Sequence, residues 1–273
     1  MIKNKMKYIP ILMYHEIIDD SYSEALLRKM QRSYFVKNSI FKQQMDFLSR
    51  NKFETISLYN LVAYLNDPFN NSLPDKCVII TFDDGYGGNY KYAFPVLEDH
   101  NFTASFFITV NSVGNEFMMD WGELKNMSDE GMSIQSHTLT HPFLRQLKDE
   151  EVKKELAESK SLLEERLGIK VDFISLPHGS YGNSYKNIAR ELGYLGGCSS
   201  ESGVNRIGVD VYFLRRINIS GDCGLSDFEQ IVQNDTILIH YLTFKKRCKI
   251  LIKNLIGERL YLKLYNIIFG LGD

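Results

Sequence analysis

Two adjacent carboxylates, Asp83 and Asp84, follow an apolar run that extends from Val78 to Phe82. A short apolar run that ends in turn residues predicts a buried strand. In barrels and in open parallel sheets, functional sites are built at the carboxyl ends of the strands. Because neighbouring strand residues point to opposite sides, the two carboxylates suit different tasks, one on a metal ion and one on a proton. The alternative is a simple Asp-Gly turn whose aspartate caps the next helix.

Two histidines, His137 and His141, follow another apolar run and are separated by four positions. Imidazole nitrogen is a preferred ligand of zinc and similar transition metals. By itself this spacing is a weak signal, because surface or core histidines often satisfy it by chance. Its weight comes from the aspartate pair in the same chain and from a late histidine, His240, at the end of a further apolar run.

The segments that must position these residues alternate between short apolar runs and stretches of helical period. The apolar runs, which we expect to form strands, cover residues 8–14, 77–82, 103–110, 132–136, 171–176, 194–199, 212–217 and 236–241. Ser57 is placed to cap a helix over the following residues, and Gly168 to end a charged helix over residues 148–167. This alternation is typical of parallel α/β folds, because each crossover helix must cover the sheet. It allows a doubly wound open sheet or a closed barrel, and the missing G-x-G-x-x-G fingerprint disfavours a nucleotide-binding open sheet.

Composition and charge exclude several classes of protein. The chain has 273 residues, of which 44% are hydrophobic and 24% charged, which argues against disorder, collagen and a multi-span membrane protein. The 32 Lys and Arg residues against 34 Asp and Glu residues argue against nucleic acid as a partner. The 4 cysteines are far apart and are expected to be reduced packing residues.

The two ends of the chain predict where the protein is located and how it is divided into domains. The start is basic, but its apolar run is short and no small-residue cleavage site follows, so we expect no export signal and a cytoplasmic or inner-face, membrane-associated location. We expect residues 1–241 to form a single catalytic domain and residues 242–273 a basic, apolar helical tail. That tail could cap the domain, or it could make peripheral contact with an anionic membrane.

Four motifs resemble, in order, those of the polysaccharide deacetylases of the NodB-homology type, carbohydrate esterase family 4. They are Thr81–Gly85, His137–Pro142, Pro177–Gly179 and Leu238–His240. The opening Met13-Tyr14-His15 looks most like the bacterial branch that includes poly-N-acetylglucosamine deacetylases. The resemblance implies an α/β fold, a distorted (β/α) barrel with a single catalytic domain. It also implies a metal-dependent hydrolase that removes N-acetyl groups from N-acetylated amino sugars of the GlcNAc type, in a bacterial polysaccharide or its precursor, and releases acetate.

The resemblance further implies roles for the residues that bind metal and move protons. Asp84, His137 and His141 would hold one divalent metal, for which zinc is preferred and cobalt or nickel are alternatives. Asp83 would be the general base toward the attacking water, and His240 the acid that protonates the departing amine.

Other matched positions would contact the N-acetylated glycan. The backbone N–H of His178 would help to form an oxyanion hole, and Leu238 would pack beneath the acetyl methyl group. Trp121 and Tyr86 are weaker candidates for the wall of the sugar cleft, and a packing role is the commoner outcome for a single tryptophan. His15 could line the same cleft, although a hydrogen-bonded core histidine is an equal alternative.

The sequence departs from the family at Ser175, where many members carry an arginine that orients the catalytic aspartate. We expect another cation to take this place, and Arg215 and Arg216 are the candidates. Because consecutive strand residues face opposite ways, one of the two should point inward. The alternative places both side chains at the surface.

Two rival functions stay open at this stage. The same metal, base and acid could cleave an O-acetyl ester on a glycan. The loss of the motif arginine at Ser175 gives some weight to a non-catalytic glycan-binding scaffold with the same fold. Against the scaffold, the metal-binding and proton-transferring residues of the four motifs are all present.

Overall fold

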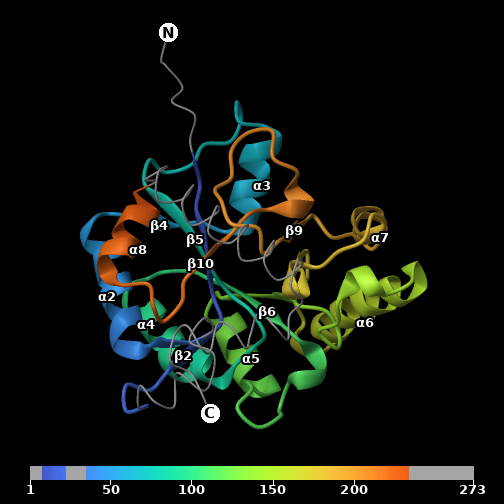
Figure 1. Ribbon diagram of the computed structural model, residues 1–273, viewed down its shortest axis with the longest axis horizontal. Helices are drawn as coiled ribbons and strands as arrows, with labels where there is room; N and C mark the ends of the chain where they lie inside the picture. The colour runs from blue at the N-terminus through green and yellow to red at the C-terminus, as the bar shows by residue number, and fades with distance from the viewer. Residues whose placement is uncertain (1–7, 23–34, 234–273) are drawn as a thin grey trace, which may run out of the picture.

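Parallel strands form the centre of the molecule in the computed structural model, which describes residues 8–22 and 35–233 (Figure 1). The order of the paired strands is β10-β1-β5-β6-β7-β8-β9, and β4 adds to β5. Their bounds are β1 Ile11–Tyr14, β4 Glu54–Thr55, β5 Cys77–Phe82, β6 Ser105–Ile108, β7 Ser133–Ser136, β8 Phe173–Ser175, β9 Gly196–Cys198 and β10 Ile217–Asn218. A separate parallel pair is formed by β2 Glu16–Ile18 and β3 Phe35–Lys37.

The chain around β10 joins the two edges of this sheet. Leu214 pairs with Cys198 of β9, and Ile217 pairs with Leu12 of β1. The strands therefore curl into a distorted barrel, which confirms the expected fold class and rules out the doubly wound open sheet. The joint is irregular, because a 3-10 turn, η6 Val211–Phe213, replaces the first half of the strand predicted over 212–217. The Asp210 carboxylate favours that turn by accepting a hydrogen bond from the Tyr212 N–H at 3.1 Å.

Helices surround the strands (Figure 1). Their bounds are α2 Asn38–Arg50, α3 Leu58–Asn66, α4 Phe94–Asp99, α5 Trp121–Asp129, α6 Asp149–Leu167, α7 Tyr185–Glu191 and α8 Leu225–Val232. The predicted caps are confirmed, since Ser57 accepts a hydrogen bond from the Asn60 N–H and Gly168 ends α6 with φ 69°. In the described ranges, no helix is both long and apolar enough to cross a membrane.

The side chains of the strands divide between two hydrophobic cores. Along β5, Val78 and Ile80 join the larger core beneath the outer helices, whereas Cys77 and Ile79 join a smaller core inside the barrel. Helix α3 supplies four side chains to the inner core, which also contains Ile9 and residues from the starts of the strands. By the same alternation, the positions of β5 and its extension that follow Ile79 inward are Thr81 and Asp83. One of the two predicted carboxylates is thereby directed into the barrel.

Candidate active site

Three predicted metal ligands meet at the carboxyl ends of β5 and β7. The Asp84 Oδ1 atom lies 3.3 Å from Nε2 of His137 and 3.2 Å from Nε2 of His141. All three ligand atoms lie within 4.8 Å of one another. One carboxylate oxygen and two imidazole nitrogens form a donor set that suits zinc, cobalt or nickel.

Hydrogen bonding and charge prepare this donor set to bind a cation. The Nδ1 atom of His137 lies 2.9 Å from the Ser175 carbonyl oxygen, which can only accept, so Nδ1 carries the proton and Nε2 faces Asp84. Burial raises the pKa of Asp84, but its hydrogen bonds with His137 and His141 outweigh burial and hold that pKa well below its usual range. Burial lowers the pKa of His137, but the charges of Asp83 and Asp84 outweigh burial and leave it raised.

A carboxylate from α6 holds the loop between the two histidines. Glu155 accepts hydrogen bonds from the Leu139 N–H at 3.0 Å, from the Thr140 N–H at 2.9 Å and from the Thr140 hydroxyl at 2.6 Å. The loop needs such support because His141 has φ 62°, a left-handed conformation that costs a residue other than glycine about 1–3 kcal/mol. Sequence reasoning missed Glu155, because nothing in a charged helix marks which glutamate turns toward a loop.

Asp83 lies beside this group and is paired with Arg216 inside the barrel. The Arg216 Nη1 and Nη2 atoms donate to the two carboxylate oxygens of Asp83, each at 2.7 Å, and the Arg216 side chain is 0% exposed. The Ser175 hydroxyl lies between them, 3.1 Å from Asp83 Oδ2 and 2.8 Å from Arg216 Nη2. Burial raises the pKa of Asp83, but the guanidinium charge outweighs burial and holds the pKa below its usual value. Asp83 is therefore an ionised carboxylate with a fixed orientation.

The neighbouring arginine points the other way. Arg215 has a side chain that is 50% exposed, and its Nε atom lies 3.9 Å from the Glu201 carboxylate. Of the two arginines predicted as orienting cations, Arg216 is thus the one that the structure places against Asp83. The residue that stands at the family's arginine position, Ser175, contacts both partners and leaves space that the guanidinium of Arg216 occupies.

Two further histidines lie near the metal ligands. Burial lowers the pKa of His15, against the opposing charges of Asp83 and Asp84, so this partly buried ring stays neutral. His178 lies in the 3-10 turn η5 Pro177–Gly179 with φ 58°, and its ring meets the His141 ring edge-on at a centroid distance of 4.5 Å. Its other neighbour is Phe143, which was not singled out from the sequence and which stacks on it with centroids 3.9 Å apart.

Trp121 and Tyr86, the two weaker candidates, lie in other surroundings. Trp121 begins α5 and packs against the outer core, with the Arg166 guanidinium 5.7 Å above its ring. This contact is the packing role that is common for a single tryptophan. Tyr86 follows the Asp84 turn and forms an isolated antiparallel bridge with Met118.

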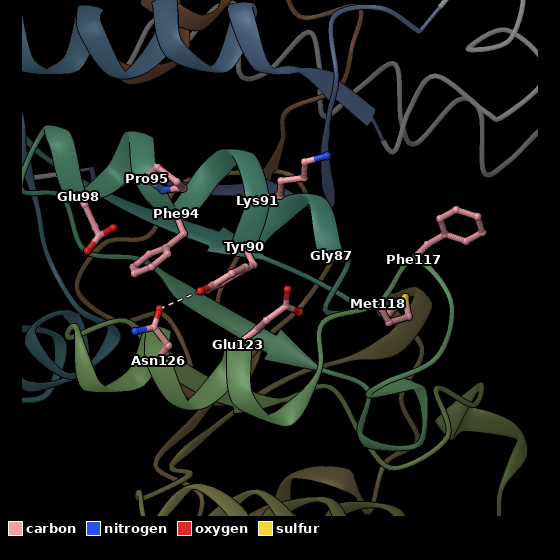
Figure 2. Close-up of a pocket in the computed structure, with 10 residues that line it drawn as sticks. All are labelled: Gly87, Tyr90, Lys91, Phe94, Pro95, Glu98, Phe117, Met118, Glu123 and Asn126. Carbon is pink, nitrogen blue, oxygen red and sulfur yellow. Dashed lines mark hydrogen bonds between the residues drawn. The ribbon is translucent and has the colours of Figure 1, made fainter.

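A groove of about 700 Å³ begins next to Tyr86, at Gly87, and runs along the outer wall of the barrel (Figure 2). It lies between α5 on one side and α4 with the π-helical turn η2 Asn89–Ala93 on the other, and a hydrogen bond of 3.1 Å from Tyr90 to Asn126 crosses it. None of the three candidate metal ligands lines this groove. It is therefore separate from the site described above.

Some predicted residues lie outside the described part of the chain. They are His240, Leu238, the strand predicted over 236–241 and the tail of residues 242–273. The roles of His240 as the acid and of Leu238 beneath the acetyl methyl group stay predictions.

Comparison with known proteins finds relatives of this chain. The family described as polysaccharide deacetylase matches residues 70–197. A putative polysaccharide deacetylase of Bacillus subtilis, YxkH, is 30% identical over 226 residues, which cover 83% of this chain and 76% of that protein. The poly-beta-1,6-N-acetyl-D-glucosamine N-deacetylase of Staphylococcus aureus is 25% identical over 216 residues, which cover 74% of this chain and 72% of that protein.

The structure also matches solved structures. The Streptococcus pyogenes deacetylase PplD, solved in complex with acetate, superposes with a TM-score of 0.76 and 26% identity, over 83% of this chain and 99% of that chain. The agreement thus covers the fold as well as the sequence. The chain belongs to the polysaccharide deacetylase family.

Proposed function

We propose that this chain is a metal-dependent hydrolase that removes N-acetyl groups from GlcNAc-type amino sugars in a bacterial polysaccharide or its precursor. The observation that carries the proposal is the pairing of two units: Asp84 with two histidines, and an ionised Asp83 fixed by Arg216. A metal centre beside an oriented carboxylate can supply the two things that metal-dependent amide hydrolysis uses, a Lewis acid and a general base. The Staphylococcus aureus relative named for poly-N-acetylglucosamine and the acetate complex of PplD support this substrate class.

Asp84, His137 and His141 would hold one divalent cation, of which zinc, cobalt and nickel fit the donors. Such a cation supplies Lewis-acid chemistry, which polarises a carbonyl oxygen and favours deprotonation of water. The protein's part is to keep Asp84 ionised and to present Nε2 of His137, which the Ser175 carbonyl ensures. Glu155 contributes by fixing the loop that carries His141.

Asp83 would take the proton from the attacking water. A carboxylate has about four acceptor positions, two on each oxygen. Oδ2 accepts from both Arg216 and Ser175, whereas Oδ1 accepts from Arg216 Nη1 and can accept from water at its second position. A placed base typically contributes about 10²–10⁴-fold in rate. His240, the predicted acid, would supply a separate proton to the departing amine. Because the guanidinium disfavours a neutral Asp83, we expect Asp83 to pass the proton that it takes from water to solvent after the amide bond breaks.

Acetate release under controlled metal content tests the proposal. The substrates are GlcNAc oligomers and, for comparison, acetylated xylan, each with added zinc, cobalt or nickel and with a chelator. We expect acetate from the GlcNAc oligomers, its loss with chelator, and its return when the metal is restored. A matched variant, Asp84→Asn, should lose both metal binding and acetate release.

Three outcomes would overturn the proposal. Acetate from acetylated xylan alone would identify an O-acetyl esterase. Metal and sugar binding without acetate from either substrate would identify a glycan-binding scaffold. Unchanged acetate release after complete metal removal would refute the metal dependence.

A further inference from the structure

An exposed pair of stacked rings stands at the edge of the proposed metal site. Phe143 and His178 lie with ring centroids 3.9 Å apart and ring planes inclined by 12°. The Phe143 side chain remains 47% exposed although one face is covered by His178. We call these two rings the aromatic platform. A single exposed phenylalanine is ordinary. A functional role for Phe143 therefore depends on where the ring lies and on which contacts hold it there.

The platform is continuous with the candidate metal ligands. The ring of His178 meets the ring of His141 at 4.5 Å, and Phe143 follows His141 by two residues. The three rings thus form a row that leads from the metal site to the surface. In a glycan whose acetyl group lies at the metal site, the neighbouring sugar would lie along this row of rings.

Contacts within and between the two loops that carry Phe143 and His178 hold the aromatic platform in place. The Arg145 N–H donates to the Ser180 hydroxyl at 3.3 Å, which links the loop after β7 to the loop after β8. Leu144, next to Phe143, is buried in the outer core. His178 keeps a left-handed backbone with φ 58°, a costly conformation that persists only where the surroundings enforce it. The exposed ring is therefore fixed in position before any ligand binds.

We propose that Phe143 forms a sugar-binding subsite that packs against the pyranose next to the residue being deacetylated. This inference rests on the proposed function and names the part of the glycan that this position contacts. The C–H face of a pyranose is flat and apolar, and it matches an exposed aromatic ring that carries no polar atom. Phe143 is a positioning residue for the chain of the glycan, because it touches a sugar that does not react.

The test compares Phe143→Ala with the wild-type protein on substrates of different length. For a GlcNAc tetramer we expect KM to rise about five- to tenfold with little change in kcat, the loss that corresponds to one aromatic contact. For monomeric GlcNAc, which has no neighbouring sugar, KM should stay unchanged. Phe143→Tyr should behave like the wild type, because it keeps the ring.

A matched control is Phe117→Ala. Phe117 is 71% exposed, lines the outer groove and lies outside the proposed site, so this variant should leave both substrates unaffected. Equal KM values of wild type and Phe143→Ala for the tetramer would overturn the subsite. A loss of kcat shared by monomer and tetramer, with weaker binding of cobalt, would instead identify Phe143 as a support for His141 and would also overturn it.

A binding measurement separates failure of the subsite from failure of the proposed function. Calorimetric titration of the metal-free protein with the GlcNAc tetramer needs no turnover. Binding by the wild type that weakens five- to tenfold in Phe143→Ala supports the subsite even if no acetate is released. Equal binding by both proteins refutes the subsite alone, whereas absence of both binding and acetate release in the wild type refutes the proposed function with it.

Discussion

Replacing Arg216 with lysine tests whether the guanidinium geometry, beyond its charge, fixes the proposed base. Arg216 donates to both oxygens of Asp83 at 2.7 Å and, through Nε, to the Ser199 carbonyl at 3.0 Å. A lysine ammonium keeps the positive charge but cannot span both carboxylate oxygens in the same plane. Arg216→Lys should therefore leave Asp83 ionised while allowing its carboxylate to rotate.

The magnitude follows from the hydrogen bonds that the variant loses. A hydrogen bond to a charged group contributes about 1.5–3 kcal/mol, so loss of one of the two bonds to Asp83 corresponds to about a 10- to 150-fold fall in kcat/KM. We expect the fall to appear mainly in kcat, measured as acetate release from GlcNAc oligomers. Thermal unfolding of the variant should remain cooperative, because the buried carboxylate keeps a cationic partner.

Two further variants make this prediction refutable. Arg215→Lys should behave like the wild type, because the Arg215 side chain is half-exposed and its Nε atom lies 3.9 Å from the carboxylate of Glu201, away from Asp83. In a double variant, Ser175→Arg with Arg216→Ser, an arginine returns to the family's motif position and should recover part of the activity lost in Arg216→Ser. A folded Arg216→Lys protein with native kcat would refute the orienting role.

Three other predictions concern support and packing. Glu155→Gln should weaken zinc affinity about tenfold, measured by competition with a chromogenic chelator, because Glu155 positions the loop that carries His141; unchanged affinity would contradict this. Gly88→Ala should destabilise the fold by about 1–3 kcal/mol in chemical unfolding, since a Cβ there would lie 2.0 Å from the Ile17 carbonyl oxygen, whereas Gly182→Ala, with nothing within 4 Å, should not. Burial raises the pKa of Glu16 to about 7 from an ordinary 4.5, so the folded state keeps a proton that the unfolded state loses, and stability should fall as pH rises between about 4.5 and about 7. Glu16→Gln should then raise the melting temperature at pH 8 but not at pH 4, and an equal shift at both would count against the burial argument.

The sequence predicted those features that depend on local pattern. The strand β5 and the charged helix α6 lie where apolar runs and helical spacing placed them, and Ser57 caps α3 as expected. Alternation of strand residues predicted that Arg215 and Arg216 would face opposite ways, although it could not say which faces inward. In the structure, Leu214 pairs with β9, and this pairing determines which of the residues that follow face into the barrel.

Features that depend on tertiary contacts were not predictable. Glu155 reaches the metal loop only because α6 packs beside β7, and the stacking of Phe143 on His178 joins two loops separated by a whole helix. The π-helical turn η2 precedes α4 at the point where Gly88 approaches the backbone of β2. Such close approaches have no signature in a single sequence.

The joint at Leu214 has a consequence for biosynthesis. Arg216 is separated from Asp83 by 133 positions in the chain, and it precedes the strand that pairs with β1. A nascent chain that has emerged only as far as α7 already contains every candidate ligand of the metal site, but its Asp83 lacks the counter-charge of Arg216. Under the proposed function, the orientation of the base would thus depend on completion of the ring, because Asp83 gains its two hydrogen bonds from Arg216 only when that segment has been made and has folded.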